Sequence, residues 1–179
     1  MTDAPDIETL DSREVYRNPW TVVREDRIRR RDGSEGLYGV VEKPNFVVVA
    51  ALGGGHLHLV EQYRYPVGAR FWELPQGAAQ IEAPEDTAAR ELREETGITA
   101  EDYEVVGFLH PSYGLTNHGF HVVLATGLTQ GEPKRDAEEQ DMITRPFPVE
   151  HVIGMVRDGI IRDAPTVAAL SLLHLNGKL

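Results

Sequence analysis

The order of apolar and polar positions divides the chain into strand-like segments first and helix-like segments towards its end. Residues 18–41 contain two strand-like runs around the turn residues 31–34, which predicts a β-hairpin preceded by a loose tail of about a dozen residues. The uninterrupted apolar run 46–52 predicts a strand that is buried on both faces. Later strands are expected over 56–63, 105–110 and 120–124.

Three segments carry helix signals. The clearest is 84–96, where Pro84 takes the first helical position and Gly97 supplies the stop. The other two helices are expected over 149–157 and 166–175. Strands, one central helix, more strands and then two helices predict an α/β fold in which helices flank mixed sheets.

Composition narrows the class of protein. The chain has 179 residues, 41% of them hydrophobic and 26% charged, which suits a globular protein with a real core. It contains no cysteine, so disulfides and thiolate chemistry are excluded. No long apolar span is found, and we expect a cytoplasmic protein without a membrane partner. The net charge of −11 argues against nucleic-acid binding, although a small anionic substrate fits a site that gathers cations locally.

The helix over 84–96 is acidic near its C-terminal end. Glu91 and Glu95 are four residues apart and therefore lie on one face, with Glu94 beside them. Carboxylates at this end of a helix oppose its dipole, so a divalent cation with oxygen ligands would compensate them. The alternative is a solvated helix face with pairs such as Arg90 with Glu94.

The sequence RELREETGI at 90–98 resembles the second half of the Nudix box at every fixed position. Glu82 precedes Arg90 by eight residues, as the box glutamate does in that family. Gly77 precedes Glu82 by five residues, one fewer than in the family pattern. Either the loop is one residue short, or Gln76 occupies the position of the box glycine.

Other segments resemble the ADP-ribose pyrophosphatase branch of the Nudix superfamily. They are EQYRYPVG at 61–68, FWELP at 71–75, DGIIRDAPT at 158–166, and the hairpin with Trp20 and Tyr38. The resemblance implies a Nudix α/β/α sandwich with mixed sheets and an N-terminal antiparallel strand extension.

The same resemblance implies a division of the chain and its assembly. Residues 1–45 would form a dimerisation and substrate segment, and residues 46–179 the hydrolase domain. A homodimer is expected, also because an isolated two-stranded hairpin is marginally stable alone.

The resemblance further implies a metal site for Mg²⁺, or Mn²⁺ in its place. Glu91 and Glu95 would be ligands, with Glu94 as a bridging or second-site ligand. The backbone carbonyl of Gln76 would complete the set, and Arg90 would orient the glutamates. Glu82 would share that orienting role or contact a second metal ion.

Residues outside the Nudix box would activate the attacking water and bind the substrate. The general base is expected on the acidic loop 136–141, at Glu139 rather than Glu138. Arg64 would contact a phosphate, the alternative being a surface arginine at a strand end. Trp20 and Tyr38 would stack on the base, the alternative being core or dimer packing.

The implied activity is Mg²⁺-dependent hydrolysis of the pyrophosphate of ADP-ribose or another nucleotide sugar. One alternative keeps the chemistry and changes the substrate to a GDP-sugar, a dinucleotide or a modified nucleoside triphosphate. The other is a non-catalytic Nudix module that senses a nucleotide.

Overall fold

The chain folds into two units, and the larger one carries the acidic helix. The computed structural model describes residues 5–79, 81–135 and 140–179. The smaller unit comprises the N-terminal segment up to Pro44 together with residues 112–118, and the larger unit comprises 45–111 and 119–179. Residues 112–118 therefore belong to the smaller unit, although the segments before and after them belong to the larger one.

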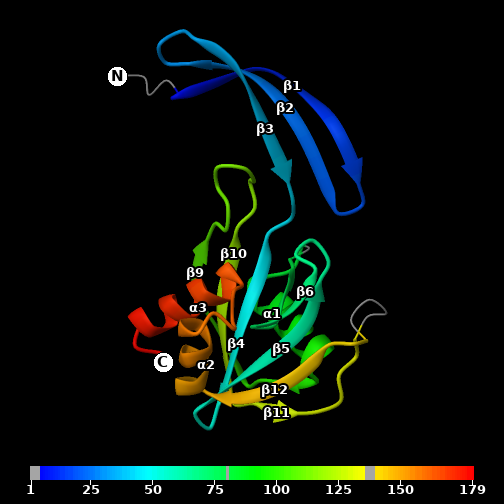
Figure 1. Ribbon diagram of the computed structural model, residues 1–179, viewed down its shortest axis with the longest axis vertical. Helices are drawn as coiled ribbons and strands as arrows, with labels where there is room; N and C mark the ends of the chain where they lie inside the picture. The colour runs from blue at the N-terminus through cyan, green and yellow to red at the C-terminus, as the bar shows by residue number, and fades with distance from the viewer. Residues whose placement is uncertain (1–4, 80, 136–139) are drawn as a thin grey trace. The chain divides into compact units, whose positions relative to one another are not determined.

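The smaller unit is a three-stranded antiparallel sheet in the order β1-β2-β3 (Figure 1). Its strands are β1 (Ile7–Asn18), β2 (Thr21–Arg30) and β3 (Glu35–Glu42). The hairpin around 31–34 is confirmed, whereas the loose tail is wrong because β1 pairs with β2 along its whole length. Most β1 side chains are exposed on both faces, so the strand carries no apolar alternation that the sequence could reveal. Backbone pairing and cross-strand ion pairs such as Arg13 with Glu25 stabilise it instead.

The larger unit contains a seven-stranded mixed sheet. The path runs β12-β5-β4-β10-β9, with β6 paired to β5 and β7 paired to β4. Only β4 and β10 are parallel to each other among these pairs. The strands are β4 (Phe46–Gly53), β5 (His56–Arg64), β6 (Ala69–Glu73), β7 (Gln76–Ala78), β9 (Asp102–Leu109), β10 (Phe120–Thr126) and β12 (Ile143–Pro148), beside a small two-stranded sheet of β8 (Ile98–Thr99) and β11 (Thr129–Gln130).

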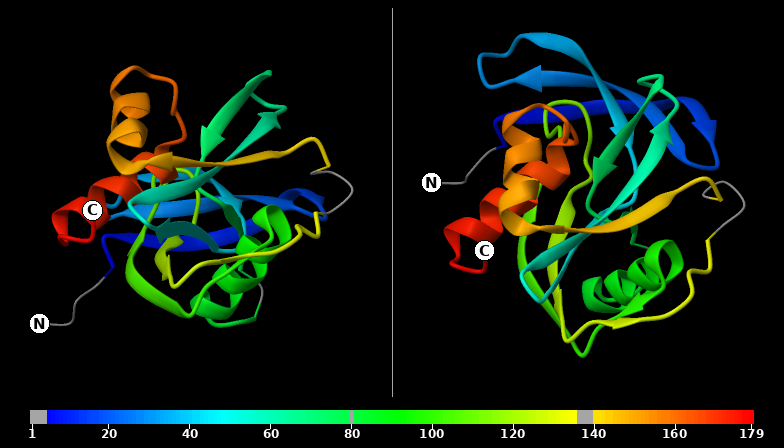
Figure 2. Two further views of the ribbon diagram at one scale, coloured as in Figure 1. Left: turned by 90° about the horizontal axis from the view of Figure 1, so that it is seen from below. Right: turned by 60° about the horizontal axis from the view of Figure 1, so that its bottom comes forward.

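Three helices cover this sheet on its two sides (Figure 2). They are α1 (Pro84–Thr96), α2 (Val149–Arg157) and α3 (Ala164–Leu175). The first two have the expected bounds, and α3 begins two residues early because the Asp163 side chain accepts the Thr166 amide and caps it. The α/β/α sandwich with mixed sheets is thus confirmed.

Strand β4 packs against helices on both faces of the sheet. Val48 and Ala50 pack in a cluster with α2 and α3, whereas Val47, Val49 and Ala51 pack in a second cluster with α1. All five side chains are fully buried, which confirms the strand predicted from the uninterrupted apolar run.

Strands β6, β7 and β12 were not anticipated from the sequence. The first two strands are short. Strand β12 contains Pro146 and Pro148, and a sheet accommodates proline only in an edge strand such as this one.

A helical membrane span requires about 20 apolar residues, and no helix in the described part of the chain meets that requirement.

Candidate active site

The C-terminal half of α1 holds an arginine among three carboxylates. Arg90 Nη1 donates to Glu91 Oε1 at 2.7 Å and to Glu94 Oε2 at 3.1 Å, and its Nε donates to Glu82 Oε2 at 3.3 Å. Its Nη2 donates to the backbone carbonyl of Ala78 at 3.2 Å, which attaches the helix to the end of β7. Burial opposes the charge of Arg90, but the surrounding carboxylates outweigh it and raise the arginine pKa.

Glu91 lies directly over the backbone of β7. A Cβ atom at position 77 would overlap the Glu91 carboxyl group, so only glycine permits this contact. This close approach favours Gly77 over Gln76 as the box glycine. With Gly77 in that position, the sequence between it and Glu82 is one residue shorter than in the family pattern.

Glu91, Glu94 and Glu95 supply carboxylate oxygens, which are the donors of a magnesium site, but in the described ranges they do not converge on one point. Glu95 is 1% exposed, and Glu91 is also buried. No three acidic or histidine side chains in the described ranges are grouped closely enough to hold a metal ion. Glu91 and Glu94 nevertheless share one cationic nitrogen, which shows that a single positive group can contact both. Hard oxygen donors in this arrangement fit Mg²⁺.

A second polar cluster lies where β6 leads into β7. The Glu73 carboxylate is 1% exposed and accepts from Arg64 Nε at 3.2 Å and from Gln62 Nε2 at 2.7 Å. Arg64 Nη2 also donates to Glu73 Oε1. Burial raises the pKa of Glu73, while Arg64 lowers it, nearby Asp163 raises it and a hydrogen bond from Gln76 lowers it. The sequence pattern alone assigns no role to Glu73 of FWELP, because it does not show which residue pairs with this carboxylate.

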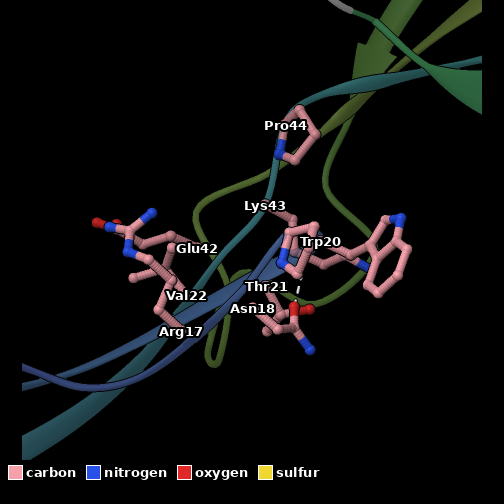
Figure 3. A pocket seen from close by; sticks show the side chains of 9 residues that line it. Arg17, Asn18, Trp20, Thr21, Val22, Glu42, Lys43 and Pro44 are labelled. Atoms are coloured by element: carbon pink, nitrogen blue, oxygen red, sulfur yellow. Dashed lines mark hydrogen bonds between the residues drawn. The ribbon is translucent and has the colours of Figure 1, made fainter.

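Trp20 borders a pocket of about 240 Å³ in the smaller unit (Figure 3). The indole is 69% exposed, and its backbone amide donates to the Asn18 side chain at 2.9 Å. The pocket is lined by Arg17, Asn18, Pro19, Trp20, Thr21, Val22, Glu42, Lys43 and Pro44. Tyr38 is not among these lining residues, and its hydroxyl donates to the Gly114 carbonyl at 3.1 Å.

Comparison with known proteins decides the family. Residues 41–170 match the model of the NUDIX domain, and residues 7–41 match that of the nucleoside diphosphate sugar hydrolase N-terminal domain. The chain belongs to the Nudix family. Helix α1 is thus the Nudix helix, and 90–98 is the second half of the Nudix box.

Proteins similar in sequence to this chain include named hydrolases. The chain is 34% identical to an ADP-ribose pyrophosphatase of Mycobacterium tuberculosis, over 94% of this chain and 84% of that protein. It is 32% identical to an ADP-ribose pyrophosphatase of Bacillus subtilis, over 83% and 82% of the two. A solved structure of an ADP compounds hydrolase has the same fold, with a TM-score of 0.87, 21% identity and full coverage of both chains. The chain is a Nudix pyrophosphohydrolase similar to the ADP-ribose pyrophosphatases.

Glu138 and Glu139, the expected general bases, lie outside the described residues. The residues on either side are anchored in the larger unit. Arg135 Nε donates at 3.0 Å to the carbonyl of Glu95 in the last turn of the Nudix helix. Asp141 accepts from Arg70 Nη1 at 2.6 Å. The acidic loop thus departs from a residue that is bonded to the Nudix helix.

Gly77→Ala is expected to lower the activity of this Nudix enzyme about tenfold to a hundredfold, because the new methyl group must displace the Glu91 carboxylate. The measurement is kcat at saturating metal, together with the melting temperature. Gly154→Ala, in α2 of the same unit, is the control, since a Cβ at position 154 meets open space. Unchanged kcat in Gly77→Ala would show that the close approach of Glu91 to β7 has no role in the reaction.

Proposed function

We propose that this chain catalyses Mg²⁺-dependent hydrolysis of the pyrophosphate in a nucleoside diphosphate linked to another group, with ADP-ribose as the first candidate substrate. The observation that carries the proposal is the placement of Glu91 over Gly77 with Arg90 joining it to Glu94 and Glu82. The names of the relatives support the choice of ADP-ribose.

Mg²⁺ would be held by Glu91 and Glu95, with Glu94 as a further ligand and the Gln76 carbonyl as a backbone donor. When bound, the ion neutralises phosphate oxygens and activates water as the nucleophile. Arg90 orients Glu91 and Glu94 and prevents three nearby carboxylates from repelling one another. Glu82 acts through its contact with Arg90.

Two groups would bind the rest of the substrate. The guanidinium of Arg64 would contact a phosphate, since it is 39% exposed and held on one side by Glu73. The exposed indole of Trp20 offers a flat face on which a nucleobase would stack (Figure 3).

A substrate panel tests the proposal. Purified protein is incubated with ADP-ribose, a GDP-sugar, a dinucleotide and a nucleoside triphosphate, and the nucleotide products are separated and quantified by ion-exchange chromatography. We expect turnover of ADP-ribose with Mg²⁺ or Mn²⁺ and none with EDTA. Faster turnover of another substrate would change the assignment within the family. Binding of nucleotides without turnover of any substrate would instead indicate a sensor.

We also propose that the chain is a homodimer. Among the residues that the structure describes, no strand pairs with the outer edge of β1 in the smaller unit. The same unit exposes the apolar side chains of Val15, Tyr16 and Leu37, which a partner surface would cover. Light scattering is expected to give twice the single-chain mass of 19.9 kDa at micromolar concentration. Leu37→Asp should shift the mass towards the monomer, whereas Ile160→Asp, at an exposed position of the larger unit, should not. A monomeric wild-type protein would contradict the proposal.

A further inference from the structure

The buried carboxylate of Glu73 accepts hydrogen bonds along one edge of the Arg64 guanidinium group. Its two oxygens accept from two different nitrogens of the guanidinium, Nε and Nη2, in a fork-to-fork arrangement. Gln62 adds a third donor at 2.7 Å. Such a bidentate pair fixes the plane of the guanidinium as well as its position.

The other edge of Arg64 is left available. Among the described residues, Nη1 of Arg64 has no hydrogen-bond partner, and 39% of the side chain is exposed to solvent. Arg64 is therefore anchored by one edge and presents the other, which is the geometry of a cation held ready for an anionic ligand.

The surroundings of Glu73 disfavour its charged form, which argues against a purely structural role for its pair with Arg64. The carboxylate is nearly completely removed from water, and a second carboxylate, Asp163, lies close enough to oppose its charge. Buried ion pairs of this kind seldom stabilise a fold more than apolar residues of the same volume would. The charge of Glu73 is therefore better explained by its effect on the position of Arg64.

The cluster is held in place from the far side. The Gln76 side chain donates to Asp163 at 3.5 Å, and Asp163 caps α3 through the backbone amide and hydroxyl of Thr166. The same Thr166 hydroxyl accepts the amide of Leu74, next to Glu73. The N-terminus of α3 therefore holds the segment from Glu73 to Gln76 against the sheet.

We propose that Glu73 is a positioning residue, which orients the guanidinium of Arg64 so that its free edge faces a phosphate of the substrate. This inference rests on the proposed function. Glu73 itself does not touch the substrate, and its effect passes entirely through Arg64.

Glu73→Gln tests the inference, because it removes the charge and keeps the shape. With the amide, Arg64 loses its bidentate partner, and we expect KM for the nucleotide to rise about tenfold while kcat changes less than about threefold. The melting temperature should stay within a few degrees of wild type, because the charge that remains, on Arg64, is 39% exposed and in contact with water. Glu61→Gln is the matched control: it breaks the more exposed pair of Glu61 with Arg70 on the same two strands and should leave KM unchanged.

Arg64→Gln supplies a second measurement. If Glu73 acts only through Arg64, then adding Glu73→Gln to Arg64→Gln should raise KM no further. A further tenfold rise in the double variant would overturn the inference, as would an unchanged KM in Glu73→Gln alone.

The NMR signal of the Arg64 side chain separates this inference from the proposed function. In wild type the Arg64 Nε–H should be protected from exchange and should shift when inorganic pyrophosphate is added; both features should be lost in Glu73→Gln. If no nucleotide is hydrolysed but the signal behaves in this way, the proposed function fails and the positioning role stands. An Arg64 Nε–H that exchanges equally fast in wild type and Glu73→Gln would refute the positioning role.

Discussion

Replacing Glu95 by glutamine is expected to lower kcat about a thousandfold at saturating Mg²⁺, because a lost metal ligand removes several kcal/mol of transition-state stabilisation. Glu95 is 1% exposed and lies one helical turn after Glu91 on the Nudix helix. The amide has nearly the same size, and it removes a buried charge, so the fold should persist. The measurements are kcat over a range of Mg²⁺ concentrations and the rise in melting temperature that Mg²⁺ causes.

Glu91→Gln should behave in the same way, whereas Glu85→Gln serves as the control. Glu85 is in the first turn of the same helix, six residues before Glu91, and makes no contact with Arg90 among the contacts of the described residues. We expect near-normal kcat and an unchanged response to Mg²⁺ in that variant. Near-normal turnover in both Glu91→Gln and Glu95→Gln would mean that the Nudix box is not the active site.

Glu139→Gln is expected to lower kcat by about 10²- to 10⁴-fold, the usual range for the loss of a general base. A glutamate bound to a cation is poorly placed to accept a proton, so the base should come from outside the Nudix helix. The acidic loop is suited to this task because Arg135, just before it, bonds to the backbone of Glu95. The affinity for Mg²⁺ should hardly change, which distinguishes this variant from Glu95→Gln.

Glu138→Gln is the matched control, since it makes the same change one residue earlier in the chain. It is expected to retain most of the activity. An inactive Glu138→Gln beside an active Glu139→Gln would move the base by one residue. If both variants are active, the base is not in this loop, and the carboxylates of the Nudix helix become the candidates.

The sequence by itself determined the Nudix helix. Pro84 starts it, and Gly97 ends it with a φ of 77°, a left-handed conformation that favours glycine. These are local signals, and the spacing of Glu91, Glu94 and Glu95 follows from them through the helical period. The strand β4 was equally evident, because a strand covered by helices on both sides requires an uninterrupted apolar run.

Only the tertiary structure decided how this helix is used. The contact of Glu91 with β7 depends on Gly77, and neither the helix period nor the box spacing shows which residue of 76 and 77 it meets. The pairing of Glu73 with Arg64 joins the two strands of the β5–β6 hairpin, and β6 was not anticipated from the sequence. Strand β1 was missed as well, since backbone pairing leaves no pattern in side chains that are exposed on both faces. Local signals thus specify an element and its chemistry, whereas contacts between distant segments decide which of its groups meet.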